Sequence, residues 1–189
     1  MNKPFAVYFA SFLLMNVACS QNKATADRAV GDACDACELM FEGMPASLSP
    51  ETRIAPLDEP GGPLLISGVI YQKDGKTPAS DVILYVYHTN NNGTYARGAS
   101  QRDGKRHGHL RGWMKTNAQG EYKFRTIRPA AYPSRKAPQH IHPLIKEPYT
   151  SPYWIDEYLF DDDSLLTTDE RARQQRRGGP GIIHLGNLP

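Results

Sequence analysis

The sequence has few cysteines, almost no net charge and no hydrophobic run of membrane length. Three cysteines occur in 189 residues, and no second cysteine pair exists to complete a zinc site. Lysine and arginine (22 residues) nearly balance aspartate and glutamate (20 residues), so the net charge of +2 gives no reason to expect nucleic acid as a partner. The apolar run Phe5–Met15 is too short to span a bilayer.

The composition is that of one globular core. Hydrophobic residues make up 40% of the chain and aromatic residues 10%, which is enough to bury a core. Sixteen glycines and fifteen prolines are scattered along the sequence, and this favours short strands and turns over long helices. We therefore expect a mainly β protein.

The N-terminal segment has the pattern of a targeting signal. Lys3 precedes the apolar run Phe5–Met15, and small residues lead to Cys19. Residues 1–18 resemble a bacterial lipoprotein signal, cut before Cys19, which would then carry the lipid. Asn16 stands where such signals usually have leucine, so ordinary secretory cleavage is the alternative. Both interpretations predict an exported protein, and the first predicts a lipid anchor on the periplasmic or cell-surface side of a membrane.

The other two cysteines, Cys34 and Cys37, lie close together in the string CDAC. In an oxidising compartment this spacing predicts a local disulfide, with a redox-active pair or a metal clip as alternatives. Both cysteines belong to residues 19–60. This segment is predicted to be a polar tether followed by an irregular arm, rich in proline and glycine, that packs on the domain.

Residues 61–189 have the pattern of strands separated by turns. Apolar, β-branched and aromatic residues cluster in short segments, and charged residues alternate with them in several. The pattern predicts an antiparallel β-sandwich. The expected strands are residues 64–71, 81–89, 110–116, 121–127, 139–145, 153–160 and 181–185.

One helix is expected near the end of the chain, in the string TTDERARQQRRGG. Thr167 can cap its N-terminus with Glu170 three residues later, and Gly178 can end it. Acidic residues come early and arginines late, which matches the helix dipole. The arginines are therefore interpreted as a solvated helix face rather than an anion site.

Two histidines, His140 and His142, stand one residue apart in the string PQHIHP. In a strand they point to the same side, with Ile141 on the other, so they can present two nitrogens to one metal ion. Glu157 or one of the acids Asp161–Asp163 would complete a two-histidine, one-carboxylate triad. Two loop tyrosines, Tyr95 and Tyr132, are further candidates, since loop residues are often aimed at sites.

At these positions the sequence resembles the intradiol ring-cleavage dioxygenases, the family of catechol and protocatechuate dioxygenases. The resemblance implies a β-sandwich that holds a mononuclear, non-haem Fe(III) with Tyr95, Tyr132, His140 and His142. Phenolate oxygen suits a hard trivalent ion, which removes the phenolic protons. The resemblance rests on four segments in this order: residues 67–95 (ending NNNGTY), 110–133 (ending RPAAYP), 140–142 (HIH) and 157–163 (EYLFDDD).

The resemblance also implies an activity. A catechol-type diol would bind the iron through both oxygens, and Tyr132 would act as the base for one of its protons. Reaction with O2 would then give a cis,cis-muconate-type product. The sequence identifies neither the natural diol nor the residues that contact it.

Two departures from the family pattern favour an alternative. Ala137 stands where better-known members have an arginine, and Glu157 stands where they have a glutamine. A membrane-anchored β-sandwich binding module, which keeps the fold without the turnover, is therefore a second hypothesis. A different metalloenzyme on the same ligands is a third. His107 and His109 form another histidine pair, interpreted as part of a polar loop, and no partner is predicted for His88.

Overall fold

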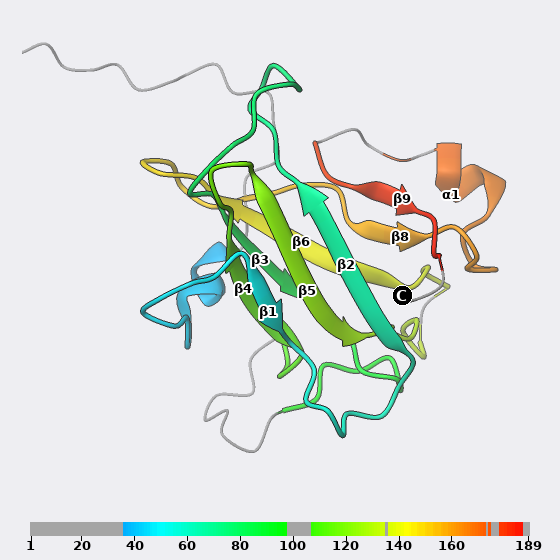
Figure 1. Cartoon of the computed structure of the whole chain (residues 1–189). Helices are drawn as coiled ribbons and strands as arrows, with labels where there is room; N and C mark the ends of the chain where they lie inside the picture. Colours follow the sequence, from blue (N-terminus) through cyan, green and yellow to red (C-terminus); the bar gives the residue numbers. More distant parts are fainter. Residues whose placement is uncertain (1–35, 98–106, 135, 173, 175–177, 187–189) are drawn as a thin grey trace, which may run out of the picture.

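The computed structural model describes residues 36–97, 107–134, 136–172, 174 and 178–186, and it shows two β-sheets packed face to face (Figure 1). The smaller sheet has the strand order β1-β5-β2, and the larger has β4-β3-β6-β8-β9, with β7 paired to β6. The strands are β1 (Glu51–Arg53), β2 (Pro63–Val69), β3 (Ile83–Tyr87), β4 (Arg111–Lys115), β5 (Glu121–Ile127), β6 (His140–Lys146), β7 (Tyr153–Trp154), β8 (Tyr158–Phe160) and β9 (Gly181–Ile183).

The space between the sheets holds the main core, because alternate residues of each strand point into it. Leu84 and Val86 of β3 and Ile141 of β6 are buried there against Phe124 of β5. In β5 the predicted alternation holds: Phe124 and Thr126 are buried between more exposed charged residues. This core fixes β3 and β6, the two strands that matter most for the site.

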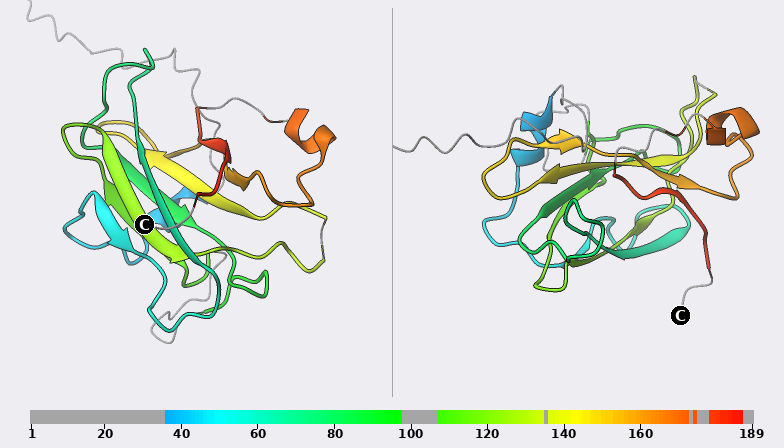
Figure 2. Two further views of the ribbon diagram at one scale, coloured as in Figure 1. Left: turned by 45° about the vertical axis from the view of Figure 1, so that its right-hand side comes forward. Right: turned by 90° about the horizontal axis from the view of Figure 1, so that it is seen from above.

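The other face of the larger sheet carries a second cluster. Tyr85 and Tyr87 of β3 and Leu144 of β6 pack there against Cys37 and Met40 of the 3-10 helix η1 (Cys37–Phe41). Figure 2 (right) shows η1 on the side of this sheet that faces away from β2. The predicted packing of the arm on the domain is thus seen in the structure. Cys37 is disulfide-bonded, and its predicted partner Cys34 lies outside the described residues.

The predicted β-sandwich is confirmed, with three differences of detail. Two strand pairs, β1 with β5 and β8 with β9, are parallel, so the sheets are mixed rather than purely antiparallel. Strand β1 comes from the segment predicted as an irregular arm. The expected strand at 153–160 is divided into β7 and β8, because residues 155–157 leave the ladder. Each difference depends on a pairing partner distant in sequence, which local patterns do not reveal.

The expected helix is α1 (Thr168–Ala172), and it begins as predicted. The Glu170 backbone N–H donates to Thr167 Oγ1 at 3.2 Å, which is half of a capping box. Part of the predicted continuation, at 173 and 175–177, lies outside the described residues. The predicted signal 1–18 and Cys19 also lie outside them, and lipidation stays a prediction. Within the described part of the chain, no helix has the length and apolar character that a bilayer crossing requires.

Candidate metal centre

The four predicted ligand side chains converge on one point. His140 and His142 project from the start of β6, while Tyr95 and Tyr132 come from loops. The two tyrosine hydroxyl oxygens lie 2.6 Å apart. Nε2 of His142 lies 3.1 Å from the Tyr95 oxygen and 3.3 Å from the Tyr132 oxygen, and Nε2 of His140 lies 3.1 Å from the Tyr132 oxygen.

These separations are those of donors around a single ion. Ligand atoms held about 2 Å from a metal in tetrahedral or octahedral geometry lie roughly 3 Å from one another. The measured distances run from 2.6 to 3.3 Å. The rings of His140 and His142 stand nearly perpendicular, at 81°, so their nitrogens approach from different directions. Two phenols and two imidazoles form a mixed oxygen and nitrogen set that fits iron.

Both imidazoles present the nitrogen that a metal needs. The Nδ1–H of His140 donates to the Pro138 carbonyl oxygen at 2.6 Å, and this contact fixes Nε2 as the lone-pair nitrogen. Nδ1 of His142 faces Glu157 Oε1 at 3.0 Å. Burial, followed by the nearby His142, lowers the pKa of His140, so its ring is neutral and able to bind a cation at neutral pH.

Tyr95 keeps its proton in the absence of a cation. Burial raises the pKa of the Tyr95 phenol well above its ordinary value, and the hydrogen bond with Tyr132 adds to the shift. A bound cation reverses this preference, because its charge stabilises the phenolate. The Tyr95 phenol is therefore a half-buried group that ionises only beside a strong Lewis acid.

The loops that carry Tyr95 and Tyr132 are joined by hydrogen bonds. Thr89 Oγ1 donates to the Ala130 carbonyl oxygen at 2.6 Å, and the Ala130 N–H donates to the Asn90 carbonyl oxygen at 3.1 Å. Gly93 has a φ of +71°, and a Cβ at this position would collide with the Ala131 carbonyl oxygen. Only glycine allows this approach, so the NNNG string serves to dock the Tyr95 loop against the Tyr132 loop.

A two-histidine, one-carboxylate triad is the competing donor set. Donor atoms of His140, His142 and Glu157 all lie within 4.8 Å of one another. However, Glu157 contacts Nδ1 of His142, whereas the tyrosines contact Nε2. The two nitrogens of one imidazole point to different sides of the ring, so one ion at Nε2 shares its position with the tyrosines and not with Glu157.

The acidic run Asp161–Asp163 has structural partners instead. Asp161 pairs with Arg171 and His184, and Asp162 accepts two hydrogen bonds from Arg128, both at 2.7 Å. Asp163 is buried, and its carboxylate accepts from the backbone N–H of Gln139 at 2.6 Å. This last contact secures the chain just before His140.

The remaining histidines support the site without joining the cluster. His107 stacks on Tyr87 at 3.7 Å, and Tyr87 stacks in turn on His142 at 4.7 Å. His109 contacts the Ala96 carbonyl oxygen and, at 2.8 Å, a carboxylate oxygen of Glu59. The pair is interpreted from its sequence as part of a polar loop, whereas the structure buries His107 among aromatic rings and leaves His109 partly exposed.

His88 has partners that the sequence did not identify. Its Nδ1–H donates to the Thr89 carbonyl oxygen at 2.8 Å, and its Nε2 accepts from the Thr126 hydroxyl at 2.7 Å. Thr126 lies on β5, in the opposite sheet, so this bond ties the two layers together. Tyr122, Phe124 and Thr126 alternate with charged residues in the sequence, and this spacing is the signal that Thr126 shares the inward face of β5 with Phe124.

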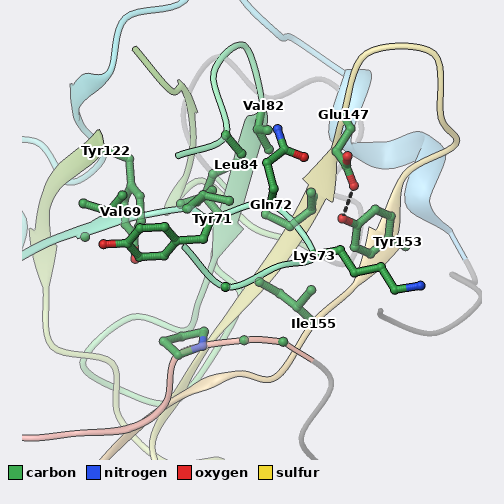
Figure 3. A pocket seen from close by; sticks show the side chains of 18 of the residues that line it. Val69, Tyr71, Gln72, Lys73, Val82, Leu84, Tyr122, Glu147, Tyr153 and Ile155 are labelled. Carbon is green, nitrogen blue, oxygen red and sulfur yellow. Dashed lines mark hydrogen bonds between the residues drawn. The ribbon is translucent and has the colours of Figure 1, made fainter. Parts of the chain in front are cut away.

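A cavity of about 420 Å³ lies at the rim of the space between the sheets (Figure 3). Its walls include Leu84, Tyr122 and Ile155, and Tyr71 lies at its opening, half exposed. The hydrogen bond from Tyr153 to Glu147 lies in its wall, which also includes Gln72 and Lys73. The cavity lies on the inner side of β3 and β6, whereas the four convergent donors lie on the outer side.

A β-sandwich that gathers two phenols and two imidazoles at one point defines a class, the β-sandwich proteins whose tyrosine–histidine cluster is suited to holding a metal ion. The family model described as "Dioxygenase" matches residues 41–175, which include all four side chains. The chain belongs to the intradiol dioxygenase family.

Curated relatives agree with this assignment. Catechol 1,2-dioxygenase 1 of Acinetobacter lwoffii is 30% identical over 118 residues, which are 60% of this chain and 36% of that protein. The protocatechuate 3,4-dioxygenase beta chain of Burkholderia cepacia is 28% identical over 116 residues, covering 58% of this chain and 49% of that one. The chain thus spans about a third to a half of these relatives' lengths.

Solved structures share the fold. The dioxygenase domain of a dioxygenase–carbohydrate-binding fusion from Streptomyces sp. SirexAA-E matches with a TM-score of 0.51 and 25% identity, covering 75% of this chain and 89% of that one. Catechol 1,2-dioxygenase from Pseudomonas arvilla C-1 matches with a TM-score of 0.55 and 23% identity, covering 74% of this chain and 48% of that one.

Proposed function

We propose that this protein is a non-haem Fe(III) intradiol dioxygenase that cleaves a catechol-type diol with O2 to a cis,cis-muconate-type product. The observation that carries the proposal is the convergence of Tyr95, Tyr132, His140 and His142, with donor atoms 2.6–3.3 Å apart. Family membership supports it independently.

Each of the four residues has a distinct task in this proposal. When bound, ferric iron supplies a Lewis acid and a template for the two oxygens of the diol. His140 and His142 would supply neutral nitrogens to the ion, and the half-buried Tyr95 would supply a phenolate oxygen. By resemblance to the family, Tyr132 would be the proton acceptor for the diol, and its hydroxyl lies on a loop within 3.3 Å of three other donor atoms.

Colour and O2 uptake test the proposal together. Protein loaded with ferric iron should be reddish from phenolate-to-iron charge transfer, the band should shift when catechol is added, and O2 should be consumed. Tyr95→Phe should remove most of the band. Tyr71→Phe, at the half-exposed rim of the other cavity, is the matched control and should leave it unchanged. A colourless, iron-loaded wild-type protein would contradict the proposed ligand set.

A binding module without turnover is the second candidate, and specific residues favour it. Ala137 provides no cation beside His140, and Glu157 places a carboxylate oxygen 3.0 Å from His142. Arg128 is occupied by Asp162 and Gln139. A coloured protein that shifts its band with catechols yet consumes no O2 with any of them would select this candidate.

A further inference from the structure

Glu157 lies on the far side of a ligand ring. Its Oε1 is 3.0 Å from Nδ1 of His142, the nitrogen that points away from the tyrosines. That nitrogen is buried, and no conventional hydrogen bond satisfies it, so the carboxylate is the charge placed to hold it. The two atoms are close but not aligned as in an ideal hydrogen bond, and we interpret the contact as an electrostatic attraction between the carboxylate and the polar Nδ1–H group.

The surroundings limit how the ring of His142 can move. Tyr87 stacks on one face at 4.7 Å, and the edge of Trp154 meets it at 5.7 Å. The Glu157 backbone lies between the buried residues Asp156 and Tyr158. Gly179 packs so closely on the Asp156 backbone that a Cβ there would collide with it. Glu157 is thus presented from a fixed stretch of chain.

The two histidines differ in what stands behind them. Nδ1 of His140 donates to a neutral backbone carbonyl, that of Pro138. Nδ1 of His142 faces a carboxylate. A charged partner binds the N–H more strongly than a neutral one and makes the opposite nitrogen a better donor to a metal.

We propose that Glu157 is a positioning residue, which orients His142 and adds negative charge to the ligand set so that Fe(III) is held more tightly. This inference rests on the proposed function. It predicts an unequal pair of imidazole ligands, with His142 the stronger donor.

The test uses the full chain loaded with ferric iron and three variants. Glu157→Gln keeps the shape and loses the charge, Glu157→Asp keeps the charge and withdraws it by one methylene, and Glu147→Gln is the matched control. Glu147 accepts a hydrogen bond from Tyr153 beside the other cavity, on the opposite side of β6. The readouts are ferric iron affinity by chelator competition and the wavelength of the charge-transfer band.

Glu157→Gln should weaken iron binding by about 10–100-fold, as loss of a supporting contact does in other metal sites. Its band should move to longer wavelength, since a less electron-rich iron accepts phenolate electrons more easily. Glu157→Asp should have an iron affinity and a band wavelength between those of Glu157→Gln and wild type. Glu147→Gln should match wild type in both readouts.

Two results would overturn the inference while leaving the proposed function intact. A coloured Glu157→Gln protein with unchanged affinity and band would show that the contact is incidental. Loss of all iron binding, as for removal of a ligand, would make Glu157 a ligand itself. A colourless wild-type protein, by contrast, would refute the proposed ligand set before the variants are compared.

Discussion

The two faces of β3 and β6 differ: the outer face carries the candidate site, and the inner face carries the core between the sheets. On the outer face lie the rings of Tyr87 and His142, which are register partners across the two strands. On the inner face lie Leu84 and Ile145, also register partners, which belong to the core between the sheets. Because side chains alternate along a strand, residues of the candidate site and residues of the core are neighbours in sequence but point to opposite faces of the sheet. Substitutions on the two faces should therefore have different consequences.

The largest effect is expected on the outer face. His142→Ala removes one nitrogen from the cluster, so iron affinity should fall by more than the ~10–100-fold that loss of a supporting contact costs. The free energy of unfolding of the metal-free protein should change little, because this side chain is not part of the core between the sheets. Chelator competition and urea unfolding measure the two quantities. A large loss of stability with iron binding retained would contradict the division between the faces.

The neighbouring residue should show the reverse. Ile141 is fully buried in the inter-sheet core, and Ile141→Ala should lower the free energy of unfolding by about 2–5 kcal/mol through the cavity it leaves. Val69→Ala, at a 39% exposed position, is the control and should cost less than about 1 kcal/mol. Urea midpoints measure both. Equal losses in the two variants would mean that the inner face does not carry the stability.

A pH dependence should come from His88, which links the two layers. Burial lowers its pKa from the ordinary 6.5 to about 4. Above pH 6.5 the ring is neutral in the folded and unfolded chains, and between pH 6.5 and 4 only the unfolded chain gains the proton. Stability should therefore fall by roughly 3 kcal/mol as pH drops through this window.

His88→Asn should reduce that slope, and His184→Asn, at a side chain that is 82% exposed, serves as the control. Urea unfolding at pH 7 and pH 4.5 measures the difference. If His88→Asn and wild type lose the same stability between these two pH values, the buried neutral histidine is not the cause.

The smallest effect is expected at the surface pair of Asp162 and Arg128. The hydrogen bonds from Arg128 lower the pKa of Asp162 below its ordinary value of 3.8. The pair therefore stabilises the fold above that pH and stops doing so as pH falls below it. Since Asp162 is 56% exposed, solvent screening limits the contribution, and Asp162→Asn should cost less than about 1 kcal/mol at pH 7. Thermal unfolding at pH 7 and pH 3 measures it, and a loss above 2 kcal/mol would indicate a role in the site.

Local patterns predicted much of this molecule. The alternation in β6 placed His140 and His142 on one side and Ile141 on the other, as the structure shows. The N-terminal cap of α1 at Thr167 was also predictable from the sequence, because it joins residues only three positions apart. The family resemblance added the two tyrosines, which no periodicity would have selected from ten.

Contacts between distant segments were not predictable in the same way. The parallel pairing of β1 with β5 and the bond from His88 to Thr126 join residues whose spacing in the sequence gives no indication that they meet. The sequence marked Glu157 both as a candidate carboxylate for the histidine pair and as a departure from the family, and the structure places it beside Nδ1 of His142 rather than on the Nε2 side.

The sequence by itself determined which side chains alternate and which turns close, since these depend on neighbours a few positions apart, and its resemblance to a known family marked four residues as candidates for one ion. Only the tertiary structure decided that the Tyr95 and Tyr132 hydroxyls meet at 2.6 Å beside the histidines. That meeting depends on two loops docked through Gly93 and on strands packed from both sides. Such convergence is a property of the whole packed chain, because each long-range contact holds only when the others are formed.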